Sequence, residues 1–405
     1  MIHYLDVAHN VREGRGLVTD SRKVRAINRD WKEAGTRLPP RPYRSYPDSD
    51  SPEHHAFYDE KGYLLLTLGL AKLTGGVRMM NVLALQSVLS AICAVMLYLA
   101  AVRLFRNEFL SVSIAATYVL NPLEITLSAA PDHPVWPVYA AVIGVSILSQ
   151  DWLGFTSAKR YVLLVAAGSF LSFCVVQRST AIAVAGMVII GAFWNFRRIG
   201  KGGMLALVVG AIIMRICISA VPLESPTIGR SLVFHTLAAG LSEFGAIEGM
   251  GWKDSEILEY ITTRYDVQFG TPEFDAAFKQ EYLAIVSERP WLPFSTAAQR
   301  VGVFLVGFRT GRNSLPIVIA FGLFKILVLI GLARWWRYAD ETGTVSIMLG
   351  CLGVTVAAIA IHVPIVPLLL VYVAPTLILL TPVAMVGGWT CVEYVIPPAW
   401  LPRWQ

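Results

Sequence analysis

Long apolar runs separated by short polar turns fill most of the 405-residue chain. A helix needs about 20 apolar residues to cross about 30 Å of hydrocarbon. We therefore expect an all-α, polytopic membrane protein with about nine transmembrane helices. The apolar runs that predict them cover residues 80–102, 109–127, 133–150, 161–177, 179–196, 203–221, 315–333, 344–362 and 366–389.

Two further apolar runs, Tyr63–Leu73 and Ser295–Phe308, are too short to span a bilayer. Runs of this length favour interfacial or re-entrant helices. Helical spacing also recurs in the polar residues 253–265 and 272–289, where Pro272 suits a first helical position. These patterns predict interfacial helices and a small helical segment beside the membrane helices.

The charged residues divide the chain further, because residues 1–62 and 222–294 hold 37 of the 62 charges. We expect four regions from this distribution: an N-terminal loop segment, a membrane domain of six spans with a short interfacial helix, a helical cap followed by an interfacial helix, and three last spans with a short tail. They cover residues 1–62, 63–221, 222–314 and 315–405, in that order.

Basic residues in the short loops predict the orientation in the membrane. One set of alternate loops contains nine of them, whereas the short loops of the opposite set contain only Arg178. Because basic loops stay in the cytoplasm, the first set and the C-terminus are expected inside, and residues 1–62 and 222–314 outside. The nine residues are Arg103, Arg106, Lys159, Arg160, Arg197, Arg198, Lys201, Arg334 and Arg337.

This use of positive charge also argues against nucleic acid as a partner, although the net charge is +6. The excess lies in short loops between apolar runs, where it sets topology. The expected location is the cell membrane of the cell envelope, with membrane lipids as surroundings.

Residues 1–62 are expected outside, yet they resemble neither a signal peptide nor a spanning helix. One explanation is that a first transmembrane helix precedes this chain, and the other is that translocation follows the first span. The pattern favours the former.

Several short motifs resemble those of the GT-C superfamily, polytopic glycosyltransferases that include protein mannosyltransferases and the aminoarabinose transferase of lipid A. Residues 8–17 resemble the "A-x-N-x-x-x-G-x-G" stretch of the first outer loop. The other similar elements are residues 59–65 ("pGYpLL"), Asn121-Pro122 with Asp132 ("NP…(S/T)E"), residues 177–180 ("RPT") and residues 278–300 ("hP…R").

The resemblance implies an enzyme that moves a sugar from a polyprenyl-phosphate donor to a lipid, glycan or protein acceptor on the outer face. The sequence departs from the family's pattern at two places. The acidic pair that usually precedes the "A-x-N" stretch would fall before Met1, and His362-Val363-Pro364 stands where the family has Arg-Tyr before the last span.

Such a transfer needs a carboxylate base for the acceptor hydroxyl and positive charge or a metal ion near the leaving phosphate. Asp132 and His133 lie between two prolines at the outer start of a predicted span. The pair suits a base or a weak metal site, and Asp132 equally suits an N-cap of that helix.

Two further acidic positions are candidates for the same chemistry. Asp59 and Glu60 precede a short predicted helix and lie close in sequence to His54 and His55, which suits a divalent ion or a solvated turn. Asp6 is the carboxylate nearest the "A-x-N" stretch and is the third catalytic candidate. A divalent metal ion, with His133 and Glu60 as ligands, is the cofactor to consider.

Basic residues at the same depth are candidates for the donor phosphate. Arg178 suits a charge-assisted pair with the phosphate or snorkelling to lipid headgroups. Arg215, about two turns inside its predicted span, is the second candidate, or it pairs structurally with Glu124. Lys325 falls near the middle of a span, where a charge marks a polar interior contact or a cavity.

The leading hypothesis is therefore a membrane glycosyltransferase of the GT-C type. A secondary transporter or lipid-carrier flippase is the main alternative, and it predicts inverted repeats and charged residues at the midplane. A third possibility is a truncated, catalytically inactive GT-C homologue that binds a lipid or a partner.

Overall fold

The computed structural model describes most of the chain and contains helices but no strands in the described ranges. Predicted spans 344–362 and, in part, 366–389 lie outside those ranges. The described residues are 2–15, 20–34, 45–47, 61–129, 135–150, 156–177, 181–221, 233–242, 247, 250, 254–267, 272–306, 315–339, 353 and 374–395.

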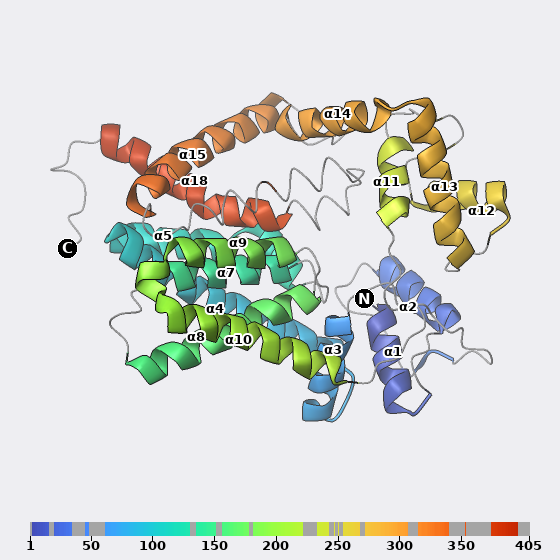
Figure 1. Ribbon diagram of the computed structural model, residues 1–405, viewed down its shortest axis with the longest axis horizontal. Helices are drawn as coiled ribbons and strands as arrows, with labels where there is room; N and C mark the ends of the chain where they lie inside the picture. The colour runs from blue at the N-terminus through green and yellow to red at the C-terminus, as the bar shows by residue number, and fades with distance from the viewer. Residues whose placement is uncertain are drawn as a thin grey trace.

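The helices form one large bundle with smaller helical pieces at one end (Figure 1). The bundle contains α4 (Met79–Phe105), α5 (Glu108–Val119), α6 (Pro122–Ala129), α7 (Trp136–Ser149), α8 (Ser157–Gln177), α9 (Ala181–Trp194), α10 (Phe196–Ser219), α15 (Leu315–Ala339) and α18 (Ala374–Val395). The smaller helices are α1 (Ile2–Arg12), α2 (Ser21–Ala34), α3 (Lys61–Thr74), α11 (Val233–Ser242), α12 (Asp254–Tyr265), α13 (Pro272–Glu288) and α14 (Leu292–Val306).

Three of the described helices, α4, α8 and α10, are long and apolar enough to cross a membrane by length and composition. Helices α5, α7 and α9 are apolar but shorter. The structure thus supports a helical fold with three candidate spans, and the prediction of nine spans is not confirmed.

The predicted span 109–127 is not a single helix. The chain leaves α5 after Val119 and starts α6 at Pro122. Proline has no N–H to donate within a helix, but it suits the first helical position. Asn121 caps α6, since its side-chain oxygen accepts the N–H of Leu123 at 2.9 Å. The Asn-Pro pair therefore ends one helix and begins the next.

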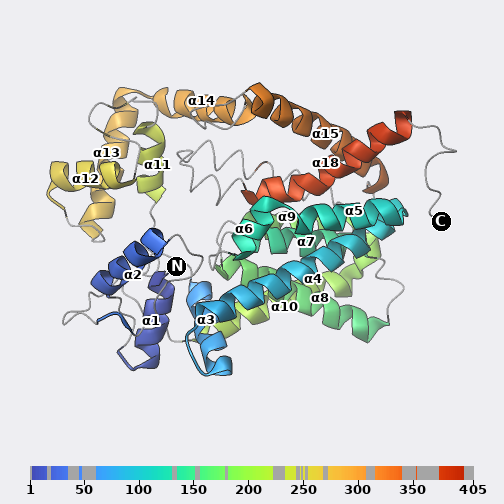
Figure 2. The same cartoon turned by 180° about the vertical axis from the view of Figure 1, so that it is seen from behind.

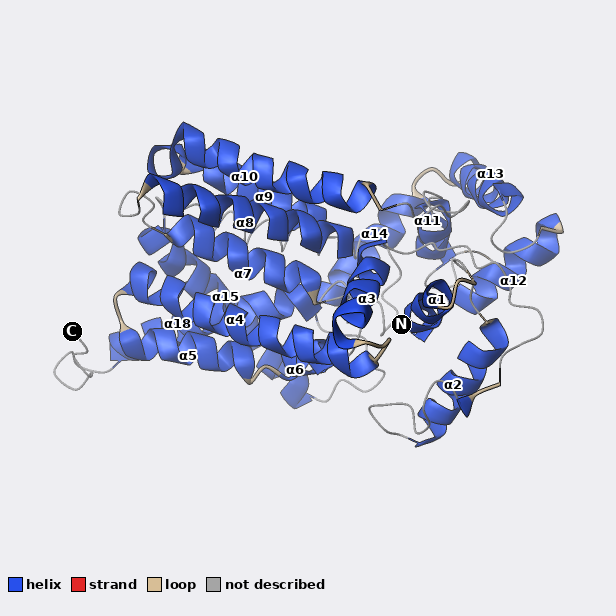
Figure 3. Ribbon diagram, turned by 90° about the horizontal axis from the view of Figure 1, so that it is seen from below, coloured by secondary structure: helices blue, strands red, loops and turns tan. Residues whose placement is uncertain are grey.

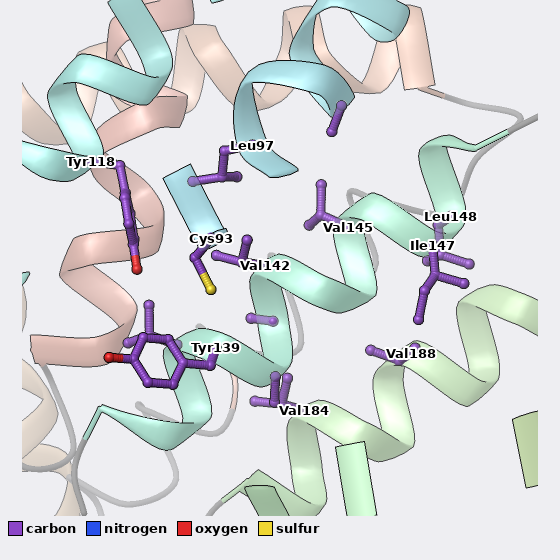
Figure 4. Close-up of a cluster of buried hydrophobic side chains, with 14 of the residues drawn as sticks. Cys93, Leu97, Tyr118, Tyr139, Val142, Val145, Ile147, Leu148, Val184 and Val188 are labelled. Atoms are coloured by element: carbon purple, nitrogen blue, oxygen red, sulfur yellow. The ribbon is translucent and has the colours of Figure 1, made fainter. Parts of the chain in front are cut away.

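Every helix of the bundle contributes buried side chains to its core, and Figure 4 shows the part between α4, α5, α7 and α9. Its middle is α7, where most residues are buried. Two buried tyrosines bring polar atoms into this core and both are satisfied: Tyr139 donates to the Gln86 carbonyl at 2.9 Å, and Tyr118 donates to Glu124 at 3.1 Å. The core is thus apolar with a few internally bonded polar groups.

Glycines allow two pairs of helices to pack with their backbones in contact. A Cβ added to Gly168 of α8 or Gly210 of α10 would lie less than 3.0 Å from the backbone of the other helix. The same holds for Gly331 of α15 and Gly387 of α18. Small residues allow such close approach between membrane helices, so these two pairs depend on them.

The segment 1–62 was expected to be a loop, but its described part contains helices α1 and α2. Amphipathic α2 buries Val24 and Ile27 against Tyr46. These helices lie beyond α3, at the same end of the molecule as α11–α13 (Figures 2 and 3). Packing of a narrow apolar stripe explains helices that the high local charge conceals in the sequence.

The predicted cap is helical, as expected: α12, α13 and α14 correspond to the helical patterns at 253–265, 272–289 and 295–308. Buried Glu281 of α13 joins α12 to α13, accepting from Tyr260 at 2.9 Å and from Tyr265 at 2.7 Å. Burial, together with the hydrogen bond to Glu281, raises the pKa of Tyr260 and of Tyr265 above the ordinary value for tyrosine. The cap therefore has its own core and polar centre.

Candidate functional site

Helix α1 places the "A-x-N" stretch on the surface of α3. Ala8 is fully buried in a small core with Val7, Tyr63 and Leu64. The helix ends at Arg12. Gly14 follows with φ +77°, and the N–H groups of Arg15 and Gly14 donate to the carbonyls of Asn10 and Val11. This is a Schellman motif, which glycine favours because it adopts positive φ without strain. The alanine and the first glycine of the stretch thus have structural roles.

Asp6 is fully buried in α1 and holds the start of α2. Its Oδ2 accepts the backbone N–H of Asp20 at 2.7 Å, and the Asn10 amide lies 3.5 Å away. Asp20 in turn caps α2, because its Oδ1 accepts the N–H of Lys23 at 3.0 Å. The Asp6 carboxylate therefore links two helices, and one of its oxygens is already used by the backbone.

Helix α3 lies between α1 and the end of α8 (Figure 1). At its start, a Cβ on Gly62 would lie less than 3.0 Å from the backbone of Val176 and Gln177. The neighbouring Tyr63 and Leu64 are 1% and 3% exposed. Gly62 of the second motif thus contacts the C-terminal end of α8, whereas Tyr63 and Leu64 pack in the small core with α1. We call the region where α3 contacts α1 and α8, and where α8 contacts α7, the outer junction, after the face on which the charge pattern predicts it.

Two buried polar groups at the outer junction have no hydrogen-bond partner among the described residues. One is the side-chain amide of Gln177, which is fully buried, and the other is Nε1 of Trp136 at the start of α7. Trp136 packs edge-on against Phe173, with ring centroids 5.4 Å apart, and Phe173 lies four residues before Gln177 on α8. Residues four apart share a helix face, so both groups belong to the same region.

An unsatisfied buried amide costs about 1–3 kcal/mol. Such groups in a folded protein call for an explanation, and a bound water, ion or ligand is one of them. The sequence singled out Gln177 only as the first residue of the motif at 177–180, and it gave Trp136 no place in the site. Their burial, which depends on α3 and α7 packing onto α8, is what distinguishes them.

Five of the predicted site residues, Asp59, Glu60, Asp132, His133 and Arg178, lie outside the described residues. Their assigned roles therefore remain predictions. Within the described part of the chain, no group of three or more His, Cys, Asp or Glu side chains is arranged to hold a metal ion.

The structure separates the two residues that were expected to pair within the membrane. Glu124 is 1% exposed, and its Oε1 accepts from Ser90 at 2.6 Å and from Tyr118 at 3.1 Å. Arg215 is exposed on α10, on a surface that it shares with Ile212 and Ile216. The structural pair of Arg215 with Glu124 is therefore wrong, because Oε1 of Glu124 accepts from hydroxyl groups of α4 and α5 and Arg215 lies on the exposed surface of α10. The other carboxyl oxygen, Oε2, is buried without a hydrogen-bond partner among the described residues. Arg215 as a phosphate ligand remains a prediction.

The break between α5 and α6 opens an apolar pocket of about 760 Å³ in the side of the bundle. Asn121 lies at its edge and donates to Thr381 of α18 at 3.0 Å. The hydroxyl groups of Ser113, Thr117 and Thr381 all donate to carbonyls of their own helices. The pocket therefore presents an apolar surface. Its lining residues are Ser113, Ala116, Thr117, Leu120, Asn121, Pro122, Leu123, Phe324, Leu377, Thr381 and Met385.

Arg300, at the end of the "hP…R" stretch, was not among the predicted site residues. It lies in α14, is 3% exposed and donates to the Gly240 carbonyl near the end of α11. A cation near the C-terminal end of a helix is favourable for the exposed carbonyls and the helix dipole. The arginine therefore connects α14 to the cap.

No protein-family model matches the sequence, and no curated protein matches it either. Among solved structures, the chain is similar to the crystal structure of the Archaeoglobus fulgidus oligosaccharyltransferase tethered to an acceptor peptide. The TM-score is 0.43 and the identity 13%, over 84% of this chain and 42% of the other. The chain thus spans less than half of that enzyme, and a likeness of this degree does not establish a family.

The fold and the site therefore define only a broad class of protein. The described chain is a helical protein with three helices able to cross a membrane by length and composition. It carries buried, unpartnered polar groups at the outer junction and an apolar pocket in the side of the bundle.

Proposed function

We propose that this protein is a membrane glycosyltransferase that moves a sugar from a polyprenyl-phosphate donor to a lipid, glycan or protein acceptor on the outer face. The observation that carries the proposal is the pair of buried, unpartnered polar groups of Gln177 and Trp136 at the outer junction. They lie where the independently recognised GT-C-like motifs meet, since Gly62 and Gln177 belong to two of those motifs.

The proposed reaction is a single displacement. An acceptor hydroxyl oxygen attacks the anomeric carbon, the bond from that carbon to the phosphate oxygen breaks, and the polyprenyl phosphate leaves. A carboxylate takes the hydroxyl proton. We assign the base to Asp132, with Asp59 as the second candidate, and the leaving phosphate to Arg178.

Asp6 is the third acidic candidate, and its surroundings favour a positioning role. Its carboxylate is fully buried and already accepts a backbone N–H at 2.7 Å. A base must instead reach the acceptor proton. Asp6 would then hold the Asp20 cap of α2 beside the outer junction.

The apolar pocket between α5, α6, α15 and α18 would take part of the polyprenyl chain of the donor. Its volume of about 760 Å³ lies within the range of about 300–1,000 Å³ that ligand pockets span. Its hydroxyl groups are satisfied within their own helices, which leaves an apolar lining suited to isoprene units.

The test separates stability from function at Gln177. Gln177→Met removes the buried amide at similar volume, so thermal stability in detergent should stay unchanged or rise. Retention of a polyprenyl-phosphate sugar, measured by native mass spectrometry, should fall about tenfold, which corresponds to about 1.4 kcal/mol. A variant that loses stability and keeps the lipid would contradict a ligand-binding role for this amide.

Two variants in the same experiment address the chemistry. Arg178→Ala should lose the bound donor, whereas Asp132→Asn should retain it intact without turnover. If wild type and all variants fail to retain or respond to such a lipid, the glycosyltransferase proposal is contradicted, and a transporter becomes the better hypothesis. Retention without any turnover by wild type would indicate an inactive homologue.

A further inference from the structure

The turn between α3 and α4 is held in one conformation by its own side chains. Gly75 has φ +79°, which reverses the chain after Thr74. The Asn81 amide donates to the Thr74 hydroxyl at 2.6 Å and to the Gly76 carbonyl at 3.3 Å, and Thr74 donates to Leu70 at 2.8 Å. The turn is therefore a rigid platform.

Two arginines from different elements converge on this platform. Nη1 of Arg12, from the last turn of α1, and Nε of Arg78, which precedes α4, each lie 3.6 Å from the position of a Cβ added to Gly76. The two nitrogen atoms are thus no further apart than twice that distance. Both residues are exposed.

No acidic group among the described residues neutralises these two cations. The nearest acid in sequence, Glu13, is engaged by His9 at 2.9 Å and by Arg15. Like charges at this spacing repel each other, and an anion between them would remove the repulsion. Guanidinium groups bind phosphate through N–H···O distances of about 2.7–2.9 Å, so one phosphate group fits this separation.

The surroundings indicate what carries the phosphate. Leu73 and Met80, on the two sides of the turn, are 84% and 55% exposed. Exposed apolar side chains beside a basic cluster suit a lipid whose headgroup contacts the arginines while its chains cover the apolar surface. Because α3 has 14 residues, at about 1.5 Å per residue the turn lies about 20 Å along that helix from Lys61 at the outer junction.

We propose that Arg12 and Arg78 form a binding site for the phosphate of an anionic phospholipid of the outer leaflet, with Leu73 and Met80 against its acyl chains. The site is separate from the outer junction and does not depend on the proposed glycosyl transfer. Its occupation would fix α1 against the start of α4.

The full-length protein in mild detergent is mixed with phosphatidylglycerol, phosphatidylcholine or undecaprenyl phosphate, and bound lipid is counted by native mass spectrometry. We expect wild type to prefer phosphatidylglycerol and the double variant Arg12→Gln/Arg78→Gln to bind it at least about tenfold more weakly. Arg29→Gln is the matched control, since the Arg29 side chain is 71% exposed on α2.

Three results would overturn the proposal: equal binding of phosphatidylglycerol by wild type and the double variant, an equal loss in Arg29→Gln, or arginine-dependent binding of undecaprenyl phosphate alone. Arg12→Lys/Arg78→Lys keeps both charges and should retain most of the binding. The lipid-binding experiment does not depend on turnover of a sugar donor. Failure of the proposed enzymatic function would therefore leave the phospholipid result unaffected.

Discussion

Gly62 and Gly69 lie in the same helix, α3, but only the first is required by packing. A Cβ on Gly62 would meet the backbone of Val176 and Gln177 at less than 3.0 Å, whereas nothing lies within 4 Å of one on Gly69. The backbone of α8 cannot move away as a flexible side chain could. The glycine of the "pGYpLL"-like motif therefore sets the distance between α3 and α8.

We expect Gly62→Ala to lower the thermal stability of the purified protein. Forcing a methyl group into a packed contact costs about 1–3 kcal/mol, more than the gain of about 1 kcal/mol that alanine brings to a helix interior. Gly69→Ala should be neutral or stabilising. Melting curves of both variants in one detergent provide the check, and equal melting temperatures would refute the packing argument.

Part of the site could be predicted at this scale and part could not. The motifs around Asn10, Gly62 and Gln177 were recognised in the sequence, and each has a defined place in the fold. Their roles were not predictable, because the burial of Gln177 depends on α7 and on α3, which lies more than 100 residues earlier in the sequence. Arg12 and Arg78 converge for the same reason: a turn in α3–α4 meets the end of α1.

Two pairs of the described helices pack closely through contacts at glycine. Helices α8 and α10 approach at Gly168 and Gly210, and α15 and α18 approach at Gly331 and Gly387. Between membrane helices, close packing and van der Waals contact replace much of the hydrophobic driving force. Each of these helix–helix contacts therefore depends on the absence of a side chain at particular positions.

Adjacent glycines in α18 allow a direct test. A Cβ on Gly387 would lie less than 3.0 Å from the backbone of α15, and one on Gly388 would contact nothing within 4 Å. Gly387→Ala should lower the melting temperature, at a cost of about 1–3 kcal/mol, and Gly388→Ala should not. If the two variants melt alike, α15 and α18 do not pack through this contact.

Element boundaries show where sequence patterns succeed and fail. Patterns at 253–265 and 272–289 correspond to α12 and α13, because Pro272 begins one helix and Pro290 follows its end. The run 109–127 was predicted as one span, since hydropathy does not register a capping side chain. The Asn121 cap and Pro122 divide it into two helices.

Over the whole molecule, the nine loop cations predict which end of the bundle faces the cytoplasm. The turn from α4 to α5, which carries Arg106, and the start of α10, which carries Arg197, lie at the same end (Figure 3). Helices α1, α2 and α3 lie at the opposite end. The arrangement of the helices is thus compatible with the orientation that the charges predict.

We expect single cysteines to report this orientation in a cysteine-free background. Glu33→Cys on α2 should react with a membrane-impermeant maleimide in intact cells, because that end is predicted outside. Lys201→Cys on α10 should react only after the cells are permeabilised. Both positions are exposed, so reaction depends on the side of the membrane, and the reverse pattern would contradict the topology.

The hydrogen bond between Asn121 and Thr381 joins residues separated by 260 positions in the chain. Synthesis runs from the N-terminus, so Asn121 is made long before its partner in α18 exists. Until then its amide lacks this acceptor, and the wall of the pocket that α18 supplies, Leu377, Thr381 and Met385, is missing as well. A polypeptide that stops before α18 would keep that polar group exposed to lipid, where each unpaired donor is costly. The bond thus distinguishes a finished chain from an unfinished one, and quality control in the membrane has a chemical difference to recognise.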